Sequence, residues 1–288
     1  MKIKASKQTD IDTILFDFFL SRKTVYFLKA EKRVRVNGTV VTKNTTIVTN
    51  DQIEIDILKP ETNDIPVYDR KIEVLYEDAY LLIINKPIDM LIYDNNNQNC
   101  LDNCVANYYL KNQLTHKVYH LHRLDRDTSG CIIYCKEPYL LAKLDYMIAN
   151  KQIQRDYLAL IEGKLENKIT INKPIGRDRH INNKFRISSS GKQAITSIEP
   201  IKYENGNTLV KCRLKTGRTH QIRVHLSYIG HPVVNDPLYG FGKASEFGQM
   251  LHSKSISFLH PRSGKRLYFE VDPPEEFMDK LNELRSEE

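Results

Sequence analysis

Residues 122–135 read HRLDRDTSGCIIYC, so a dense polar stretch stands directly before an apolar run. The apolar residues 131–135 predict a buried strand, and Gly130 permits a tight entry into it. We therefore expect the polar stretch to form a loop at the edge of a sheet, where catalytic side chains are often found. Arginines on both sides of Asp125 would favour its ionised carboxylate, which could attack an electrophilic carbon. A structural ion-pair loop without chemistry is the alternative interpretation.

The order of these residues is similar to the HRLD-x-x-T-S-G signature of the RluA-type RNA pseudouridine synthases. The resemblance implies that Asp125 is the essential aspartate of that family. It also implies that Arg123 helps to hold the target nucleotide outside the base stack. An enzyme that reworks a base must extract it first, and a side chain can fill the vacancy.

A second polar stretch, LKTGRTHQIRVHL at 214–226, carries two arginines and two histidines within nine residues. By spacing, Thr219 could cap a helix that holds His220 and Arg223. The family pattern GRTHQIRVH is intact here. The resemblance implies that Arg218 pairs with Asp125, which would orient the carboxylate and keep it charged in a dry site. A structural role is expected for His220, Arg223 and His225.

The segment RDYLALIEG, residues 155–163, resembles the part of the family that carries its active-site tyrosine, which maps to Tyr157. The family often has lysine where Arg155 lies. A tyrosine here could stack on the flipped uracil and later take a proton from its C5 atom. Without the resemblance, a strand tyrosine that packs against its neighbours is the simpler interpretation.

Residues 173–196, KPIGRDRHINNKFRISSSGKQAIT, form a strongly basic stretch that is typical of a surface following phosphates. The family shows a similar KPIGRD opening and a later GKxAxT, but it commonly has proline where Arg179 lies. The alternative is a solvated basic hairpin. The residues that we expect to contact RNA here are Lys173, Arg177, Arg179 and Lys192.

Residues 1–58 predict a small basic unit. Apolar spacing indicates helices within 11–20 and 21–33, Asn37-Gly38 predicts a hairpin, and alternation indicates a final strand within 46–57. This order resembles the S-four-type RNA-binding module of ribosomal proteins. A solvated basic helix on an ordinary small domain is the alternative. The resemblance implies that Arg22, Lys23 and Lys29 face phosphates.

Residues 59–71 predict a linker, because they hold two prolines and show no periodicity. Residues 72–288 predict an α+β domain with a mixed, mostly antiparallel sheet. The resemblance covers about residues 72–278 and implies the pseudouridine synthase catalytic fold with a central cleft. It weakens after Asn85-Lys86-Pro87, where Ile88, Asp89 and Tyr93-Asp94 replace the family's usual residues.

The net charge of +7 favours a polyanionic partner. No apolar run reaches the ~18 residues of a membrane span, and the N-terminus carries no secretory signal, so we expect a cytoplasmic protein away from membranes. Five sparse cysteines argue against a disulfide framework. Small buried hydrophobic residues are the favoured interpretation of them, and a zinc site is the alternative.

The resemblance implies an isomerase that converts uridine in RNA to pseudouridine without cofactor or metal. Ribosomal RNA of the large subunit is favoured over transfer RNA, and a monomer is expected. Two other classes stay open: an inactive RNA-binding protein, and a base-removing hydrolase. The hydrolase needs a second carboxylate at a defined separation from Asp125, and Asp127 is the one near candidate in sequence.

Overall fold

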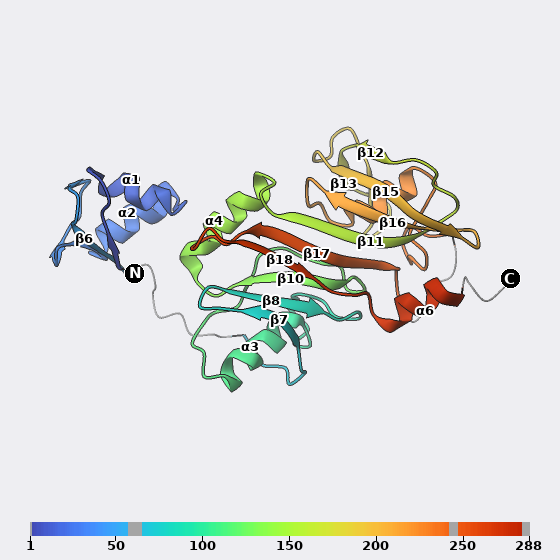
Figure 1. Ribbon diagram of the computed structural model, residues 1–288, viewed down its shortest axis with the longest axis horizontal. Helices are drawn as coiled ribbons and strands as arrows, with labels where there is room; N and C mark the ends of the chain where they lie inside the picture. The colour runs from blue at the N-terminus through green and yellow to red at the C-terminus, as the bar shows by residue number, and fades with distance from the viewer. Residues whose placement is uncertain (1, 57–64, 242–246, 284–288) are drawn as a thin grey trace.

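The computed structural model describes residues 2–56, 65–241 and 247–283, which form a small N-terminal unit and a larger unit built on one long sheet (Figure 1). No helix among these residues is long and apolar enough to cross a bilayer. The two units touch through aromatic rings: Phe19 lies 4.5 Å from Tyr146 and Phe18 lies 6.4 Å from Tyr139, between ring centroids. Both tyrosines belong to helix α4, Pro138–Ala149.

The N-terminal unit contains the two predicted helices, α1 (Ile11–Asp17) and α2 (Arg22–Ala30). The side chains of Asp10 and Ser21 cap them by accepting hydrogen bonds from backbone N–H groups three residues later. The helices pack on a sheet of order β1-β6-β3-β4, beside a short pair β2-β5. These strands are β1 Lys2–Lys4, β2 Thr9–Asp10, β3 Val34–Val36, β4 Thr39–Val40, β5 Thr46–Ile47 and β6 Gln52–Ile55.

The predicted hairpin is confirmed, because Asn37 and Gly38 both have positive φ and join β3 to β4. The prediction of one strand within 46–57 is wrong. The chain turns at Asn50, whose φ is 77°, and forms β5 and β6 in two different sheets. Of the predicted linker 59–71, residues 59–64 lie outside the described residues. The rest runs along helix α3 (Leu101–Lys111), where Tyr68 N donates to Asn103 O, so the domain boundaries stay a prediction.

The larger unit confirms the expected α+β fold with a mostly antiparallel sheet. Its sheet has the order β12-β15-β16-β11-β17-β10-β8-β7, with β18 beside β17 and β9 beside β10, and β10–β17 is its parallel pair. The strands are β7 Glu73–Glu77, β8 Leu81–Lys86, β9 Tyr119–His120, β10 Ser129–Cys135, β11 Gln154–Glu162, β12 Ile169–Asn172, β15 Ile195–Glu204, β16 Asn207–Leu214, β17 Leu251–Leu259 and β18 Arg266–Glu270. Helices α5 (Gln221–Tyr228) and α6 (Glu275–Glu283) complete it.

Both faces of the central strands are covered, which explains why the run at 131–135 is continuously apolar. In β10, Ile132 and Tyr134 pack in the cluster that includes α3 residues, whereas Cys131 and Ile133 pack in the cluster that includes α4 residues. Successive side chains of a strand point to opposite faces, so this split follows from the strand itself. All five cysteines are buried.

Gly130 allows β10 to run beside β17. Its φ is 106°, and a Cβ atom at this position would lie 2.2 Å from the carbonyl oxygen of Ser253 on β17. No other residue fits so close a backbone approach. The glycine of the HRLDRDTSG stretch therefore fixes where the preceding polar loop leaves the sheet.

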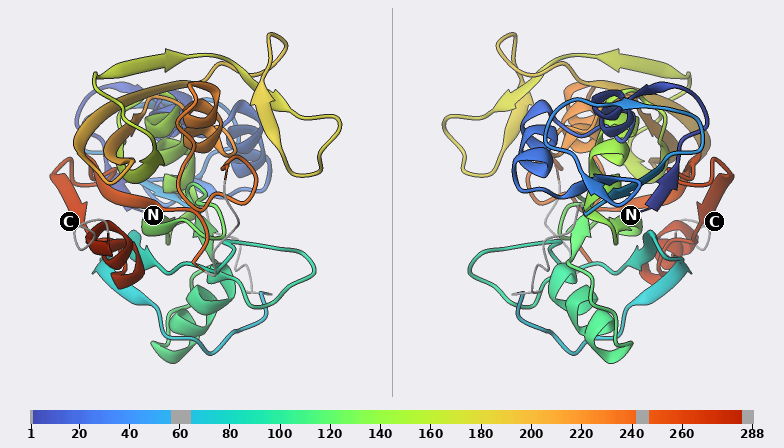
Figure 2. Two further views of the ribbon diagram at one scale, coloured as in Figure 1. Left: turned by 90° about the vertical axis from the view of Figure 1, so that its right-hand side faces the viewer. Right: turned by 90° about the vertical axis from the view of Figure 1, so that its left-hand side faces the viewer.

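A separate hairpin of β13 (Ile175–Arg177) and β14 (Phe185–Ile187) stands out from the body of the larger unit (Figure 2). It carries much of the basic stretch 173–196. Lys192 pairs with Ile175 at its base, through an isolated antiparallel bridge.

Candidate active site

Asp125 lies on the loop between β9 and β10, as predicted, with its carboxylate open to a cleft. Its side chain is 24% exposed, and its Oδ2 atom accepts a hydrogen bond from Nη1 of Arg223 at 2.9 Å. The Oδ1 atom faces Nε2 of His220 at 3.9 Å, which is too long for a hydrogen bond. One oxygen of the carboxylate is therefore fixed by the protein and the other is available.

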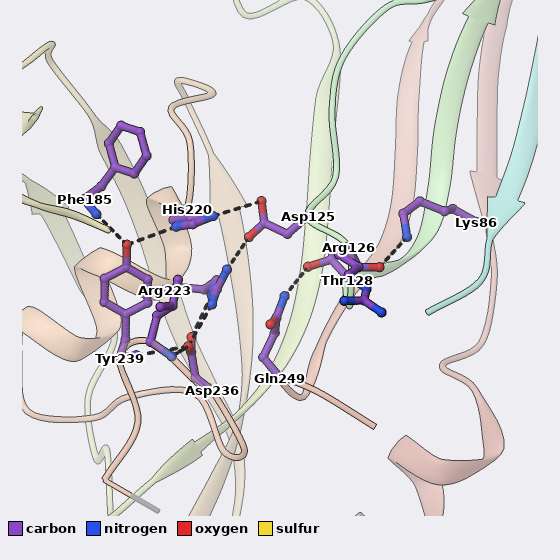
Figure 3. A network of polar contacts seen from close by, with 11 residues as sticks. Lys86, Asp125, Arg126, Thr128, Phe185, His220, Arg223, Asp236, Tyr239 and Gln249 are labelled. Carbon is purple, nitrogen blue, oxygen red and sulfur yellow. Dashed lines mark hydrogen bonds and ion pairs between the residues drawn. The ribbon is translucent and has the colours of Figure 1, made fainter. Parts of the chain in front are cut away.

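Arg223 is the central cation of the network around Asp125 (Figure 3). Its Nε and Nη2 atoms donate to the two carboxylate oxygens of Asp236 at 2.7 and 2.8 Å, and its guanidinium lies 5.1 Å from the ring centroid of Tyr239. Burial opposes the charged form, but the bonds from Asp236 and the charge of Asp125 outweigh it and raise the pKa of Arg223. A permanent positive charge is thus held against the carboxylate of Asp125.

The prediction that Arg218 pairs with Asp125 is corrected by this geometry. Arg218 is exposed in the turn before α5, and its Nε donates to the carbonyl oxygen of Gln193 at 3.0 Å. Arg223 lies in the first turn of α5 and points inward. Arg218 nevertheless lines the same cleft as Asp125, so the two arginines of the motif have different places in one site.

The predicted cap at Thr219 is also wrong. The residue before α5 is His220, in the left-handed region with φ 53°, and it makes no side-chain cap. Instead Gln221 turns its own side chain back: its Oε1 accepts from the backbone N–H of Arg218 at 3.0 Å and from Oγ1 of Thr216 at 2.7 Å. This local arrangement decides which arginine faces Asp125.

Tyr157 lies on β11 and lines the cleft beside Asp125, where the sequence placed it. Its side chain is buried, and burial raises the pKa of the Tyr157 hydroxyl above its ordinary value. The phenol is therefore neutral near pH 7. Asp156, its neighbour, is paired with Arg213 through two hydrogen bonds of 2.7 and 2.8 Å.

Asp236 and Tyr239 are site residues that the sequence did not reveal as such. The backbone N–H of Phe185 donates to the Tyr239 hydroxyl at 2.8 Å, so that hydroxyl can donate to Nδ1 of His220 at 3.0 Å. Burial lowers the pKa of His220, which favours the neutral ring. Figure 3 shows this chain from the β13–β14 hairpin to Asp125. In the sequence, both residues lie within the part that resembles the family, about residues 72–278, but the resemblance gave them no role.

Lys86 binds the backbone of the loop that carries Asp125. The Lys86 ammonium, fully buried, donates to the carbonyl oxygens of Pro87 at 2.7 Å and Arg126 at 2.8 Å. Burial lowers the pKa of Lys86 to about 7. Asp89, at which the chain departs from the family pattern, accepts a hydrogen bond from Nε of Arg126 at 2.7 Å. Asp89 thus adds a further hydrogen bond to the loop that carries Asp125.

Two adjoining cavities form the cleft. The smaller is lined by Asp125, Tyr157, His220 and Arg223 among others. The larger is a groove of about 770 Å³, within the range of ~300–1,000 Å³ that holds small-molecule ligands. The residues that line both are Arg123, Asp125, Tyr157, Leu214 and Arg218. Arg123 is exposed at this junction, where it can reach a nucleotide entering the cleft.

The other predicted RNA-contact residues lie away from the cleft. Lys173, Arg177, Arg179 and Lys192 are exposed on or near the β13–β14 hairpin. Arg22 and Lys23 are exposed at the start of α2. The expectation for Lys29 is corrected: its ammonium pairs with Asp12 of α1 at 2.5 Å and is 13% exposed. Lys29 lies on the side of α2 that faces α1, so its charge is used within the unit.

Among the described residues no group of three or more His, Cys, Asp or Glu is arranged to hold a metal ion. Burial raises the pKa of every cysteine thiol. The thiols are therefore protonated at neutral pH and pack as small apolar groups.

Comparisons with known proteins agree with this site. A family model described as RNA pseudouridylate synthase matches residues 80–228, and one described as the RluD ribosomal pseudouridine synthase N-terminal domain matches residues 2–53. The chain is 37% identical over 261 residues to the uncharacterized RNA pseudouridine synthase YhcT of Bacillus subtilis, covering 88% of this chain and 86% of that protein. It is 33% identical over 245 residues to the ribosomal large subunit pseudouridine synthase D of Zymomonas mobilis, covering 78% and 75%.

Among solved structures, human RNA pseudouridylate synthase domain containing 1 superposes with a TM-score of 0.62 at 24% identity, covering 77% of this chain and 97% of that one. This likeness supports the catalytic fold. The family models and the similarity to relatives extend over most of both units. The chain therefore belongs to the RNA pseudouridylate synthase family, whose members are isomerases acting on RNA.

Proposed function

We propose that this enzyme isomerises specific uridines in ribosomal RNA of the large subunit, with Asp125 as the catalytic carboxylate. The substrate class is supported by the relatives that are named large-subunit pseudouridine synthases and by the N-terminal match to a ribosomal pseudouridine synthase domain. We further propose that it acts as a cytoplasmic monomer, without metal or cofactor.

The observation that carries the proposal is the asymmetric environment of Asp125. Arg223 binds one carboxylate oxygen at 2.9 Å, while the other faces the cavity that Tyr157 also lines. A carboxylate that is bound by a buried guanidinium through one oxygen and has its other oxygen free can serve as a nucleophile or a base.

The reaction begins when the target uridine leaves its stack and enters the cleft, and Arg123 occupies the vacated place. The free oxygen of Asp125 either attacks the ribose or takes its 2′ hydrogen, and both routes break the C–N glycosidic bond. The detached uracil turns within the cleft and rejoins the ribose through C5. The C5 proton then leaves while N1 of the turned uracil takes up a proton, and on the second route the 2′ hydrogen is returned to the ribose, so the product has the mass of the substrate. The cleft must exclude water throughout.

Tyr157 contributes as a neutral phenol. Its ring can stack on the uracil, and its raised pKa means that a phenolate is scarce at neutral pH. We propose that it positions the base and relays the C5 proton through its hydroxyl rather than acting as a pre-formed anion.

The exposed cations of the β13–β14 hairpin and of α2 supply phosphate contacts outside the cleft. They include Arg177 and Arg179 on the hairpin and Arg22 and Lys23 on the helix. Such contacts set affinity and orientation, whereas the cleft selects the base.

The test combines mapping with one matched pair of variants. Pseudouridines in ribosomal RNA are mapped in cells with and without this protein. RNA that contains the affected site and uridine tritiated at C5 is then incubated with the enzyme, and the release of tritium is measured. We expect Asp125→Asn to abolish release with RNA affinity within a few fold, and Asp127→Asn to keep most activity. Release by Asp125→Asn at the wild-type rate would remove the assignment.

The same assay separates the alternatives. An inactive RNA-binding protein would leave the RNA unchanged and release no tritium. A base-removing hydrolase would give abasic RNA and would depend on Asp127 as well.

A further inference from the structure

Two buried side chains beside Tyr157 carry polar atoms that the protein itself does not satisfy. Nε of Arg155 and Nδ1 of His122 are shielded from solvent, and neither has a hydrogen-bond partner within residues 2–56, 65–241 and 247–283. Arg155 is only 5% exposed, yet within those same residues its guanidinium makes no ion pair. A buried charge without a partner destabilises a folded protein, so such a residue suggests a partner that arrives from outside.

The hydrogen bond at the other ring nitrogen of His122 defines its chemistry. The backbone N–H of Ile133 donates to Nε2 of His122 at 3.4 Å, so Nε2 accepts and the ring proton resides on Nδ1. Burial lowers the pKa of His122 to about 3, which keeps the ring neutral. The Nδ1–H group is thus a donor for which the backbone of Arg123 is at most a weak acceptor.

The residues Arg155 and His122 both line the 770 Å³ groove, together with other cations. The Arg and Lys residues of its lining outnumber the carboxylates, which are Asp125 and Asp145, and the cations are Arg123, Lys151, Arg155, Lys215 and Arg218. A concave surface with this balance attracts an anion.

Gly217 leaves room in front of the Arg155 guanidinium. A Cβ atom at Gly217 would lie 3.2 Å from Nη1 of Arg155, which is tighter than ordinary packing. Glycine at this position therefore keeps a side chain of residue 217 away from the Arg155 guanidinium.

The position of the two donors relates them to the target base. Arg155 and Tyr157 are two residues apart on β11, so they share one face of the strand, and both line the groove. The groove also shares Asp125 and Tyr157 with the smaller cavity. An anion held by Arg155 therefore lies next to the space for the base, where the backbone of a flipped nucleotide must pass.

We propose that Arg155 and His122 form a binding site for an oxyanion, and that its occupant is the RNA phosphodiester adjoining the target uridine. The identity of the occupant rests on the proposed function, whereas the anion site does not. The uncompensated charge in the free enzyme is neutralised when RNA binds. The site therefore lowers the folding stability of the free enzyme and raises its affinity for RNA.

The experiment uses the full chain and measures both the stability of the RNA-free protein and its affinity for RNA, because the site should affect the two in opposite directions. Arg155→Met should raise the thermal midpoint of the RNA-free protein by about 2–4 °C, because it removes a buried charge without a partner. It should also weaken binding of a labelled oligouridylate on the order of tenfold. The slope of log affinity against log salt should become shallower by about 0.7, the value for one phosphate contact on a single strand.

Lys265→Met is the matched control, because it removes an equal charge from an exposed turn outside the groove. It should leave both the midpoint and the salt slope unchanged. Arg155→Met that binds like the wild type, or that lowers the midpoint or fails to fold, would show a structural arginine and overturn the proposal.

His122 is tested with an isosteric pair. His122→Asn keeps an N–H donor near the Nδ1 position and His122→Leu has none, while both lose the acceptor for Ile133 N–H. We expect the Asn variant to bind the oligouridylate several-fold more tightly than the Leu variant. Equal binding would remove His122 from the site.

A final comparison tests whether the bound anion is an RNA phosphodiester or free phosphate. It also tests the anion site independently of the proposed isomerase activity. Oligouridylate should raise the wild-type midpoint more than the Arg155→Met midpoint, and inorganic phosphate at the same phosphate concentration should raise neither. Stabilisation by inorganic phosphate alone would instead indicate a site for free phosphate. None of these measurements needs turnover, so a protein that failed to isomerise uridine could still show the site.

Discussion

Arg223 donates to Asp125 and, through two other nitrogens, to both oxygens of Asp236. One guanidinium therefore joins the loop before β10 to the segment after α5. Asp236 is itself fixed, because its Oδ1 accepts the backbone N–H groups of Leu238 and Tyr239. The orientation of the Asp125 carboxylate thus depends on Asp236, a carboxylate that is buried and lines neither cavity of the cleft.

Replacing Arg223 by lysine should lower the single-turnover rate about 10- to 100-fold while RNA affinity stays within a few fold. A lysine keeps the charge but cannot reach both carboxylates with a planar fork. The loss corresponds to the ~1.5–3 kcal/mol of a hydrogen bond to a charged group. Rapid-quench measurement with saturating enzyme reports the rate directly.

Arg213→Lys is the matched control, because Arg213 makes the same two-bond fork to Asp156 outside the cavity that Asp125 lines. Its rate should stay within twofold of the wild type. Equal losses in the two variants would mean that the Arg223 fork supports only the fold.

The contrast between Arg218 and Arg223 shows where prediction from sequence stops. Both arginines lie in one family-like stretch, and spacing alone could not decide which one meets Asp125. The decision depends on the start of α5, where His220 takes a left-handed conformation and Gln221 supplies the turn's hydrogen bonds. Such a start is not encoded by the usual capping residues.

Elements that depend on local sequence were otherwise predicted correctly. The Asn37-Gly38 hairpin, helix α2 and the buried strand β10 follow from turn chemistry, apolar spacing and an apolar run. Long-range pairing did not follow from such rules. The parallel contact of β10 with β17 joins residues more than a hundred positions apart. Asp236 and Tyr239 become site residues through side-chain contacts with Arg223 and His220, which lie 13 and 19 positions away.

Tyr157→Phe tests what the hydroxyl does beyond packing. Phenylalanine keeps the stacking ring, so RNA affinity should remain within about threefold. The rate of pseudouridine formation should fall by about 10²–10⁴, the usual contribution of a positioned acid–base group. Pseudouridine formation and C5 tritium release, measured together, should fall in parallel; an unchanged rate would leave Tyr157 with a packing role alone.

Lys86 predicts a pH dependence of stability. Burial first, offset in part by Asp127 and Asp125, lowers its pKa from 10.5 to about 7, so between these values the unfolded chain binds more protons than the folded one. Stability therefore rises with pH in this window. The free energy of unfolding of the wild type relative to Lys86→Met should increase from pH 7 to 9, by at most ~1.4 kcal/mol per pH unit.

Urea unfolding at several pH values measures this difference. Lys86→Met should also slow catalysis, because the carbonyl of Arg126 loses the ammonium that holds the Asp125 loop. A difference in unfolding free energy that stays constant over the window would contradict the buried, easily deprotonated lysine.

The N-terminal unit contains two exposed cations and one cation that is paired within the unit. Arg22 and Lys23 are exposed at the start of α2, whereas Lys29 is paired with Asp12. The double variant Arg22→Gln/Lys23→Gln should weaken binding to the substrate RNA and reduce the magnitude of the salt slope by about 0.7–0.9 for each phosphate that the helix no longer binds.

Lys29→Gln should leave that slope unchanged and instead lower the thermal midpoint, because Asp12 loses its partner. Fluorescence anisotropy at 50–200 mM salt and thermal unfolding distinguish the two effects. If Lys29→Gln flattened the slope as much as the double variant, the ion pair would have to open on binding, and α2 would present a wider basic face to RNA than the free enzyme shows.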